Sequence, residues 1–177
     1  MYEYKCKIVK IVDGDTVDID LDLGFGVWLR DERVRIMGID TPESRTSDKI
    51  EKIFGLAAKD RLNSLLGGEA ILLSQVTKGG ENMKGKFGRI LGNFKTIDGK
   101  NVADILMEEG HAVAYNGGDK DNVQMQHLAN RQRLIDEGKV KTTVGKNLGK
   151  ITAENLIEAH KILEEGRAIG KLVLEGF

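Results

Sequence analysis

The sequence contains very little cysteine, and no segment of it is long and apolar. Cys6 is the single cysteine among 177 residues, so an internal disulfide is impossible, which fits a reducing compartment. Residues 1–6 lack the apolar run of a signal peptide, and no stretch approaches the length of a membrane span. We therefore expect a cytoplasmic protein that makes no membrane contact.

The sequence also lacks a surplus of charge of either sign. Its 27 Lys and Arg residues face 28 Asp and Glu residues, which gives a net charge of −1. A protein that coats nucleic acid indiscriminately would be basic. Binding of a polyanion must therefore occur at a local site, through a few arginines and a cation. Outside such a site we expect the binding to be weak and salt-sensitive.

A chain of this length forms one domain by default, with room for a core and an appendage. Alternation of apolar and polar residues predicts five short strands, and apolar residues at helical spacing predict intervening helices. The strands are expected at residues 4–12, 15–23, 27–38, 70–76 and 89–94, and the helices at 52–66, 101–109 and 122–137. Because the order has no βαβ rhythm, we predict an α+β fold whose mainly β core is a small closed sheet packed by helices.

Residues 33–43 are the centre of the predicted fold. Their first half alternates like a strand with one buried face, and Pro42 then ends the ladder because proline has no N–H to donate. Arg35 on this strand and the carboxylates of Asp40 and Glu43 at its end are expected to face a common space. Two carboxylates for a hard cation, one more as base and arginines for a phosphate would suit a phosphodiesterase.

Three motifs occur in a fixed order along the chain. Asp-Gly-Asp-Thr stands at 13–16, Arg-x-x-x-x-Asp-Thr-Pro-Glu at 35–43 and Lys-Phe-Gly-Arg at 86–89. Each motif alone is common, but together the three resemble the staphylococcal nuclease family over roughly residues 4–139. The resemblance implies a five-stranded OB-fold barrel, which presents one face and its loops to single-stranded nucleic acid. It also implies a calcium-dependent endonuclease that cleaves DNA and RNA to 3′-phosphate and 5′-hydroxyl ends.

The resemblance assigns the cation to Asp15, Asp40 and the backbone carbonyl of Thr41. A hard cation prefers oxygen ligands, and few protein ligands leave positions open for water and a substrate phosphate. Calcium is the family's ion, although the sequence itself does not separate it from magnesium or manganese. The alternative is that residues 13–15 form only a turn and that Asp40 is only a cap.

The same resemblance makes Glu43 the general base, which activates a water for in-line attack at phosphorus. Arg35 and Arg89 are assigned to the phosphate, because guanidinium groups suit the charge that develops on its oxygens. An ordinary helix start at Pro42-Glu43 is the alternative for the base. Arg33, two residues from Arg35 on the same strand face, is the alternative for the phosphate ligand.

The substrate-binding residues implied by the resemblance are Lys86, Phe87 and Tyr115. Lys86 would lie near a terminal phosphate, and Phe87 stands where relatives often have tyrosine, so only stacking remains. Tyr115 would stack on a nucleotide, or it is a half-buried core residue. The motifs contain no element that reads base edges, so we expect single strands to be preferred with little sequence specificity.

The other polar residues are expected to be structural. His111, His127 and His160 show no metal-ligand spacing, and for His127 and His160 on predicted helices we expect packing or solvent roles. The acids at positions 18, 20 and 22 are expected to form a solvated strand face.

Residues 141–177 fall outside the nuclease pattern. Thr152 can cap a helix at 153–165, and a short strand is predicted at 170–174. This segment resembles the carboxyl end of medium-chain quinone or zinc-type reductases. Because no G-x-G-x-x-G follows a strand, we expect no nucleotide cofactor. The tail is expected to pack on the barrel or to pair between chains, so an oligomer is possible through it.

Two rival functions remain at this point. The first is a nucleic-acid or protein-binding module of the same fold that has lost catalysis, which is disfavoured because all five catalytic positions carry matching residue types. The second is a fragment of an oxidoreductase, which is disfavoured by the missing nucleotide loop.

Overall fold

The computed structural model describes residues 2–75, 88–118, 120–140, 144–164 and 171–175. The chain divides into two compact units, residues 1–140 and residues 141–177. None of the described helices is both long enough and apolar enough to cross a membrane.

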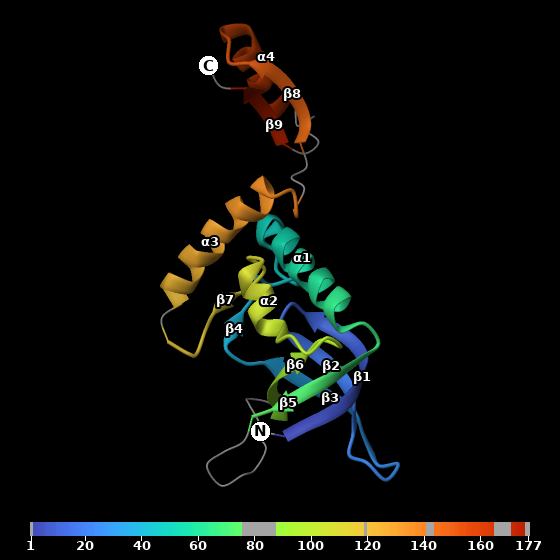
Figure 1. The fold of residues 1–177 in the computed structure, drawn as a ribbon. Coiled ribbons are helices and arrows are strands. Elements are labelled where there is room, and N and C mark those ends of the chain that lie inside the picture. Colours follow the sequence, from blue (N-terminus) through green and yellow to red (C-terminus); the bar gives the residue numbers. More distant parts are fainter. Residues whose placement is uncertain (1, 76–87, 119, 141–143, 165–170, 176–177) are drawn as a thin grey trace. The chain divides into compact units, whose positions relative to one another are not determined.

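The first unit is built on a closed barrel of five strands (Figure 1). Its members are β1 (Tyr2–Asp13), β2 (Thr16–Asp22), β3 (Trp28–Ile36), β5 (Glu69–Ser74) and β6 (Ile90–Lys95). The order β1-β2-β3-β6-β5 closes because β5 pairs with β1, and only the β3–β6 pair is parallel. Closure removes the exposed strand edges that invite association with other chains. The predicted α+β fold with an OB-type barrel is confirmed.

Strand β2 shows how the sequence pattern builds the barrel. Val17 and Ile19 are fully buried, while Asp18 and Asp20, which follow them, remain partly exposed, as the alternation predicts. The polar face is not simply solvated, however. Asp18 accepts two hydrogen bonds from Arg33, and Asp20 is ion-paired with Arg30, so cross-strand arginines balance the acids of this face.

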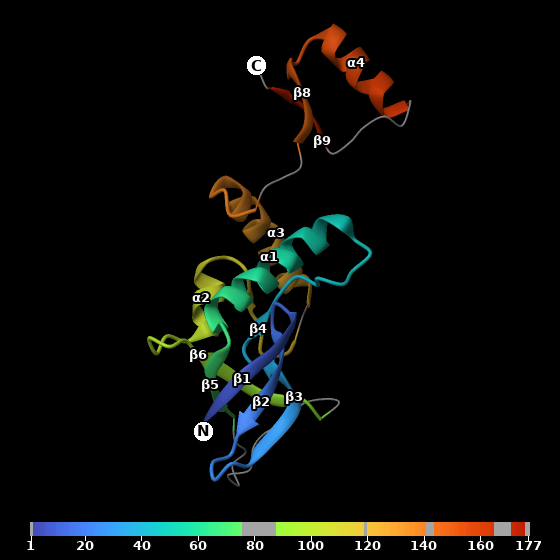
Figure 2. The ribbon, with the colours of Figure 1, turned by 90° about the vertical axis from the view of Figure 1, so that its right-hand side faces the viewer.

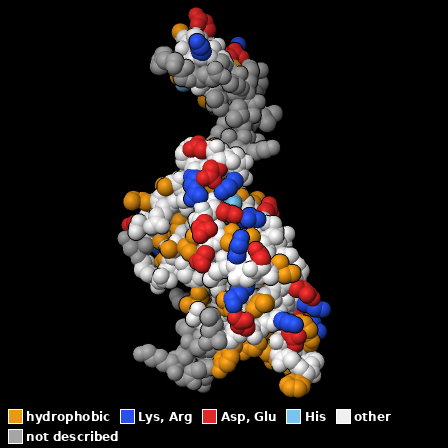
Figure 3. Space-filling view, in the orientation of Figure 1, with side chains coloured by type: hydrophobic (Ala, Val, Ile, Leu, Met, Phe, Trp, Pro, Cys, Tyr) orange, Lys and Arg blue, Asp and Glu red, His pale blue; other side chains and the backbone are white. Residues whose placement is uncertain are grey.

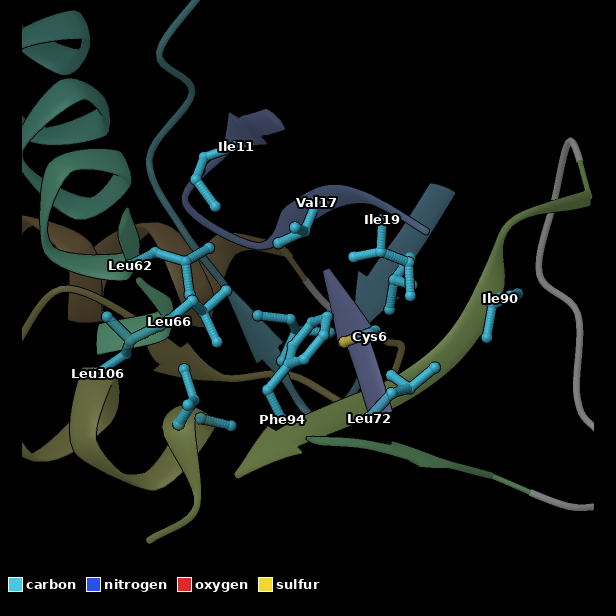
Figure 4. Packing of buried hydrophobic residues seen from close by; sticks show 14 of the residues in the cluster. Cys6, Ile11, Val17, Ile19, Leu62, Leu66, Leu72, Ile90, Phe94 and Leu106 are labelled. Carbon is cyan, nitrogen blue, oxygen red and sulfur yellow. The ribbon is translucent and has the colours of Figure 1, made fainter. Parts of the chain in front are cut away.

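The barrel interior continues into the helices that cover one of its ends. Figures 1 and 2 both show α1 (Lys49–Leu66) and α2 (Val102–Glu108) at this end. Figure 4 shows Phe94 of β6 between Cys6 of β1 and Leu66 of α1, and all three belong to the buried cluster. The lone cysteine is therefore a core residue, and burial raises the pKa of its thiol to about 11.

Two short strands and a third helix complete the first unit. β4 (Ile39–Asp40) pairs antiparallel with β7 (Val113–Ala114), and α3 (Lys120–Asp136) follows. Leu134 of α3 packs with Val140 and with Phe54 of α1 in a second buried cluster. β7 is thus the partner of the strand that carries Asp40.

Helix α1 begins one turn earlier than predicted. Asp48 caps it, since its Oδ1 accepts hydrogen bonds from the backbone N–H groups of Ile50 at 2.8 Å and Glu51 at 3.2 Å. The predicted start at residue 52 was wrong, because the first turn is mostly charged and its one apolar residue, Ile50, is exposed. An aspartate followed three residues later by glutamate is nevertheless a capping signal that the sequence contains.

The second unit contains two strands around a helix. β8 (Val144–Lys150) and β9 (Lys171–Glu175) pair in parallel, with α4 (Ala153–Glu164) between them along the chain. Thr152 caps α4 as predicted, because its Oγ1 accepts a hydrogen bond from the Asn155 N–H at 3.2 Å. The predicted helix and strand are present, but β8 was missed.

Candidate active site

The turn between β1 and β2 carries the first acidic motif into contact with the segment around Asp40. A Cβ atom on Gly14 would lie 2.8 Å from Thr41 Oγ1 and 2.9 Å from the Cβ of Ala58 in α1. Because real Cβ atoms do not approach so closely, only glycine lets this turn pack against Thr41 and the helix. The close approach brings Asp15 beside the β3–β4 region.

Arg35 lies between the two aspartates assigned to the cation. Its Nη1 is 2.9 Å from Asp15 Oδ2, and its Nη2 is 3.8 Å from Asp40 Oδ1. The guanidinium also donates to the backbone carbonyls of Ile36 at 2.9 Å and Ile39 at 3.0 Å. The β3–β4 turn therefore fixes the arginine through its own backbone, and the arginine in turn orients the carboxylates.

A single pocket of about 610 Å³ collects most of the predicted site residues. Those that line it are Asp15, Arg35, Asp40, Glu43 and Arg89. They come from the β1–β2 turn, from β3, from β4 and the loop that follows it, and from the residue before β6. Five side chains far apart in the sequence thus face one space.

The remaining predicted residues are placed differently. Thr41 is buried at 5 % exposure and does not line this pocket. Tyr115 is half-buried, and its N–H donates to the Gly38 carbonyl at 2.8 Å; it is not among the described residues that line the pocket. Lys86 and Phe87 lie outside the described residues.

Arg33 is not equivalent to Arg35, although both lie on the outer face of β3 and both line the pocket. Arg33 donates to the two carboxylate oxygens of Asp18, with its Nε at 2.7 Å and its Nη2 at 2.9 Å. Its planar fork is thus matched to a carboxylate of β2. Between the two arginines, only Arg35 contacts the acids of the site.

The pocket holds more negative than positive charge at its centre. Asp13, which the sequence analysis left without a role, lines the pocket beside Asp15 and Glu43 and is 8 % exposed. Burial raises the pKa of Asp15 despite the nearby Arg35 guanidinium. Burial, followed by repulsion from Asp13, also raises the pKa of Glu43. Crowded carboxylates of this kind are stabilised by a cation.

The loop that carries Glu43 is held from two sides. Asp13 Oδ1 accepts a hydrogen bond from the Ser44 N–H at 3.2 Å, and Glu51 Oε1 accepts one from the Glu43 N–H at 3.4 Å. A Cβ on Gly55 of α1 would lie only 2.5 Å from the Glu43 carbonyl carbon and oxygen. Helix α1 therefore packs directly on the backbone of this loop.

His127 of α3 contacts one of the predicted site residues, which the sequence analysis did not foresee. Its Nε2 lies 3.0 Å from Asp40 Oδ2, and the residue is 5 % exposed. The ring is thus buried, in agreement with the expected packing role, and it also has the Asp40 carboxylate as its partner. The two residues are 87 positions apart, and no local pattern in the sequence signals the contact.

The donor atoms fit a hard cation. Asp15 and Asp40 bring carboxylate oxygens to the pocket, which are the ligand type that Ca²⁺ and Mg²⁺ take, whereas the carbonyl of Thr41 remains an expectation from the resemblance because Thr41 does not line the pocket. Within the described residues, no three side chains of His, Cys, Asp or Glu group closely enough to hold a metal ion by themselves. A cation here would need the backbone oxygen, water and a phosphate to complete its shell.

Comparison with known proteins agrees with this arrangement. Residues 33–140 match the model of the staphylococcal nuclease homologues. The chain belongs to this family. An uncharacterized endonuclease of Escherichia coli is 27% identical over 129 residues, which is 72% of each chain, and the protein of strain O157:H7 is 26% identical over the same length. Endonuclease YhcR of Bacillus subtilis (strain 168) is 30% identical over 119 residues, which cover 64% of this chain and 9% of that protein.

Proposed function

We propose that this member of the staphylococcal nuclease family is an endonuclease that hydrolyses phosphodiester bonds of DNA and RNA. The reaction would depend on a divalent cation, and calcium is the proposed ion. The observation that carries the proposal is the single pocket lined by Asp15, Asp40, Glu43, Arg35 and Arg89. The endonuclease names of the relatives support it.

Asp15, Asp40 and the Thr41 carbonyl would hold the cation. When bound, it would supply Lewis-acid stabilisation to a phosphoryl oxygen. Magnesium or manganese could occupy the same oxygen ligands, because ligand type alone does not separate these ions.

Glu43 would accept the proton of the attacking water. The water would attack phosphorus in line with the 5′ oxygen, and the bond between phosphorus and that oxygen would break. The 5′ oxygen would take up a proton from solvent, which leaves a 3′-phosphate and a 5′-hydroxyl. The packing of the Glu43 loop against Asp13 and α1 supports this role, because a base acts only when it is held at hydrogen-bond distance from the proton it takes.

Arg35 and Arg89 would stabilise the charge that grows on the phosphate oxygens. A guanidinium has five N–H donors, and the short contacts of Arg35 with Asp15, Ile36 and Ile39 use three of them. The others can reach an oxyanion, and the fixed orientation of the group means that little reorganisation is needed during the reaction.

Extended single strands are the proposed substrate, cleaved with little sequence specificity. An OB-type barrel accommodates single strands through its face and loops. Charged side chains of both signs are interspersed over the face seen in Figure 3, so this face offers no uniform positive field for duplex binding. Binding outside the pocket is accordingly expected to be weak and salt-sensitive.

A cleavage assay on single-stranded DNA with Ca²⁺, and then with a chelator, tests the proposal. Cleavage that stops in chelator is expected, whereas cleavage that persists would reject the role of the cation. Glu43→Gln should slow turnover by about 10²–10⁴. Glu69→Gln, at an exposed position of β5, is the matched control and should be unaffected. Binding without any cleavage would instead favour a module that has lost catalysis.

A further inference from the structure

The ring of His127 is the one histidine ring that the described structure places against an acid of the proposed cation site. It comes from α3, a helix that lines no part of the pocket, and reaches Asp40 Oδ2 at 3.0 Å. An ionised carboxylate can only accept hydrogen bonds, so the Nε2 of the ring carries the hydrogen and donates it. The ring is 5 % exposed, so water does not compete strongly for this bond.

The two oxygens of Asp40 therefore have different surroundings. Oδ2 is taken by His127, while Oδ1 lies on the side of Arg35, whose Nη2 is 3.8 Å away. A carboxylate with one oxygen anchored cannot rotate freely about its χ2 angle. The histidine thus decides which oxygen is left for a ligand in the pocket.

Asp40 is also held through its backbone, and α3 contributes to that as well. Asp40 pairs with Val113 across the β4–β7 ladder, and the Asn130 side chain of α3 donates to the neighbouring Ala112 carbonyl at 3.4 Å. Figure 1 shows α3 running beside β7 and β4. Helix α3 therefore makes two separate attachments, one to the Asp40 carboxylate and one to the backbone near its pairing partner.

We propose that His127 is a positioning residue for the cation site, which acts by holding the Asp40 carboxylate with Oδ1 free to serve as a monodentate ligand. The inference rests on the proposed function only in assigning Asp40 to a cation. Histidine–carboxylate pairs next to metal sites typically change metal affinity or activity by about 10- to 100-fold when they are broken.

Calcium affinity of the full chain, measured by titration calorimetry without nucleic acid, tests this directly. His127→Leu should raise the dissociation constant by about 10- to 100-fold. His127→Gln should stay within about threefold of wild type, because the Gln amide nitrogen reaches the place of the ring Nε2 and can donate to the same oxygen. His127→Asn has a side chain one bond shorter than that of Gln, so its amide does not reach Asp40 and its calcium affinity should fall as in the leucine variant. If the leucine variant does not fold, the comparison of the Gln and Asn variants still tests the proposal.

Asn130→Ala is the matched control on the same helix, because it removes the backbone attachment and leaves the Asp40 carboxylate untouched. It should lower the melting temperature slightly and leave calcium affinity within about threefold of wild type. Equal losses of calcium affinity in Asn130→Ala and His127→Leu would overturn the proposal. An unchanged calcium affinity in His127→Leu would also overturn it. So would a His127→Gln variant that binds calcium as weakly as His127→Asn. A wild-type chain that binds calcium but cleaves nothing would contradict the nuclease function and leave the role of His127 standing.

Discussion

At the scale of single residues, Arg35 offsets part of the negative charge of the pocket before any ligand binds. The acids Asp13, Asp15, Asp40 and Glu43 line one pocket, and burial raises the pKa of two of them. Arg35 contacts Asp15 closely and Asp40 more loosely, while two backbone carbonyls hold its fork in place. The arginine thus balances part of the charge, and its orientation is fixed by contacts within the chain.

Arg35→Lys should lower kcat/KM on single-stranded DNA by about 10²–10³, because a site loses about that much when one oriented donor to a developing oxyanion is removed. A lysine ammonium is a single point charge and cannot donate to Ile36, Ile39 and a phosphate together. Steady-state kinetics measures the loss.

Arg33→Lys is the control for this substitution, because Arg33 lies on the same strand face and its fork is bound to Asp18. Its kcat/KM should stay within about threefold of wild type. Equal losses in the two variants would mean that the site does not distinguish the arginines.

The residues that the sequence could reveal were those within short motifs. Asp15, Asp40 and Glu43 occur in turns whose residue types suggest their roles, and the structure brings all three into one pocket. Asp13 was overlooked as a plain turn residue, and His127 was overlooked because its contact spans 87 positions. Helical periodicity shows that a histidine lies on a helix, but it does not show which distant carboxylate the ring will meet.

At the scale of elements, helix α1 supports the loop that carries Glu43. Gly55 allows the helix to touch the backbone of Glu43 and Ser44, and Glu51 of the same helix accepts the Glu43 N–H. About one turn further along α1, Gly14 lets the β1–β2 turn approach Ala58. Two glycines thus set the distances between a helix, a turn and a loop.

Gly55→Ala should destabilise the fold although alanine is the better helix former. Helix propensity favours alanine by about 1 kcal/mol, but the new Cβ would lie 2.5–2.6 Å from backbone atoms of Glu43 and Ser44. Overpacking against backbone costs about 1–3 kcal/mol and moves the loop. We therefore expect a net loss of stability in urea unfolding, together with a fall in kcat of at least about tenfold.

Gly68→Ala is the control for the glycine, since no atom lies within 4 Å of a Cβ placed there. Its stability and turnover should equal those of wild type. A Gly55→Ala variant that is more stable than wild type and fully active would show that the loop yields to the helix at no cost.

Helices α1 and α2 are joined by an ion pair whose strength should depend on pH. Arg61 Nε and Nη2 donate to the two oxygens of Glu109 at 2.6 and 2.7 Å, and this hydrogen bonding lowers the pKa of Glu109 below its ordinary value of 4.5. Because the folded-state pKa is the lower one, the pair contributes fully above about pH 4.5, and its contribution is lost as the pH falls through the folded-state pKa.

Glu109→Gln should therefore reduce the free energy of unfolding at pH 7 by about 0.5–1 kcal/mol, the range for a partly exposed pair. The difference from wild type should shrink as the pH is lowered below 4.5. Urea unfolding at pH 7, 5, 4 and 3 measures it. Glu108→Gln, at the exposed neighbouring position, controls for the change in net charge. A stability difference between wild type and Glu109→Gln that stays constant from pH 7 to pH 3 would show that the Arg61–Glu109 ion pair is not its cause.

Sequence pattern predicted the barrel strands well because their alternation is enforced by a buried face, as in β2. It failed for β8, where Gly145, Lys146 and Gly149 interrupt any alternation of apolar residues. The start of α1 was missed for a related reason, since its first turn is mostly charged and its one apolar residue, Ile50, is exposed, so the cap Asp48 is the clearer signal. Strand β8 is defined by its pairing with β9, and the start of α1 is defined by its cap Asp48, rather than by periodicity.

At the scale of the whole molecule, the boundary between the two compact units coincides with the end of the family match at residue 140. The last turn of α3 is closed by the N–H groups of Lys139 and Val140, which both donate to the Leu134 carbonyl. Val140 is 5 % exposed and packs with Leu134 and Phe54. The first unit therefore completes its own second cluster with its last residue.

A chain that ends at Val140 should keep the stability and the nuclease activity of the full chain, because the barrel, the pocket and both buried clusters lie within residues 1–140. A chain that ends at Asp136 should be less stable by about 1.5–3 kcal/mol, since it loses the buried Val140 side chain and the two bonds to the Leu134 carbonyl. Urea unfolding compares the free energy of unfolding of the three chains. The solution mass of the full chain and of the chain that ends at Val140 shows whether residues 141–177 join two copies. If ending the chain at Val140 cost as much as ending it at Asp136, the second unit would have to contribute to the stability of the first, and the independence of the nuclease unit would be lost.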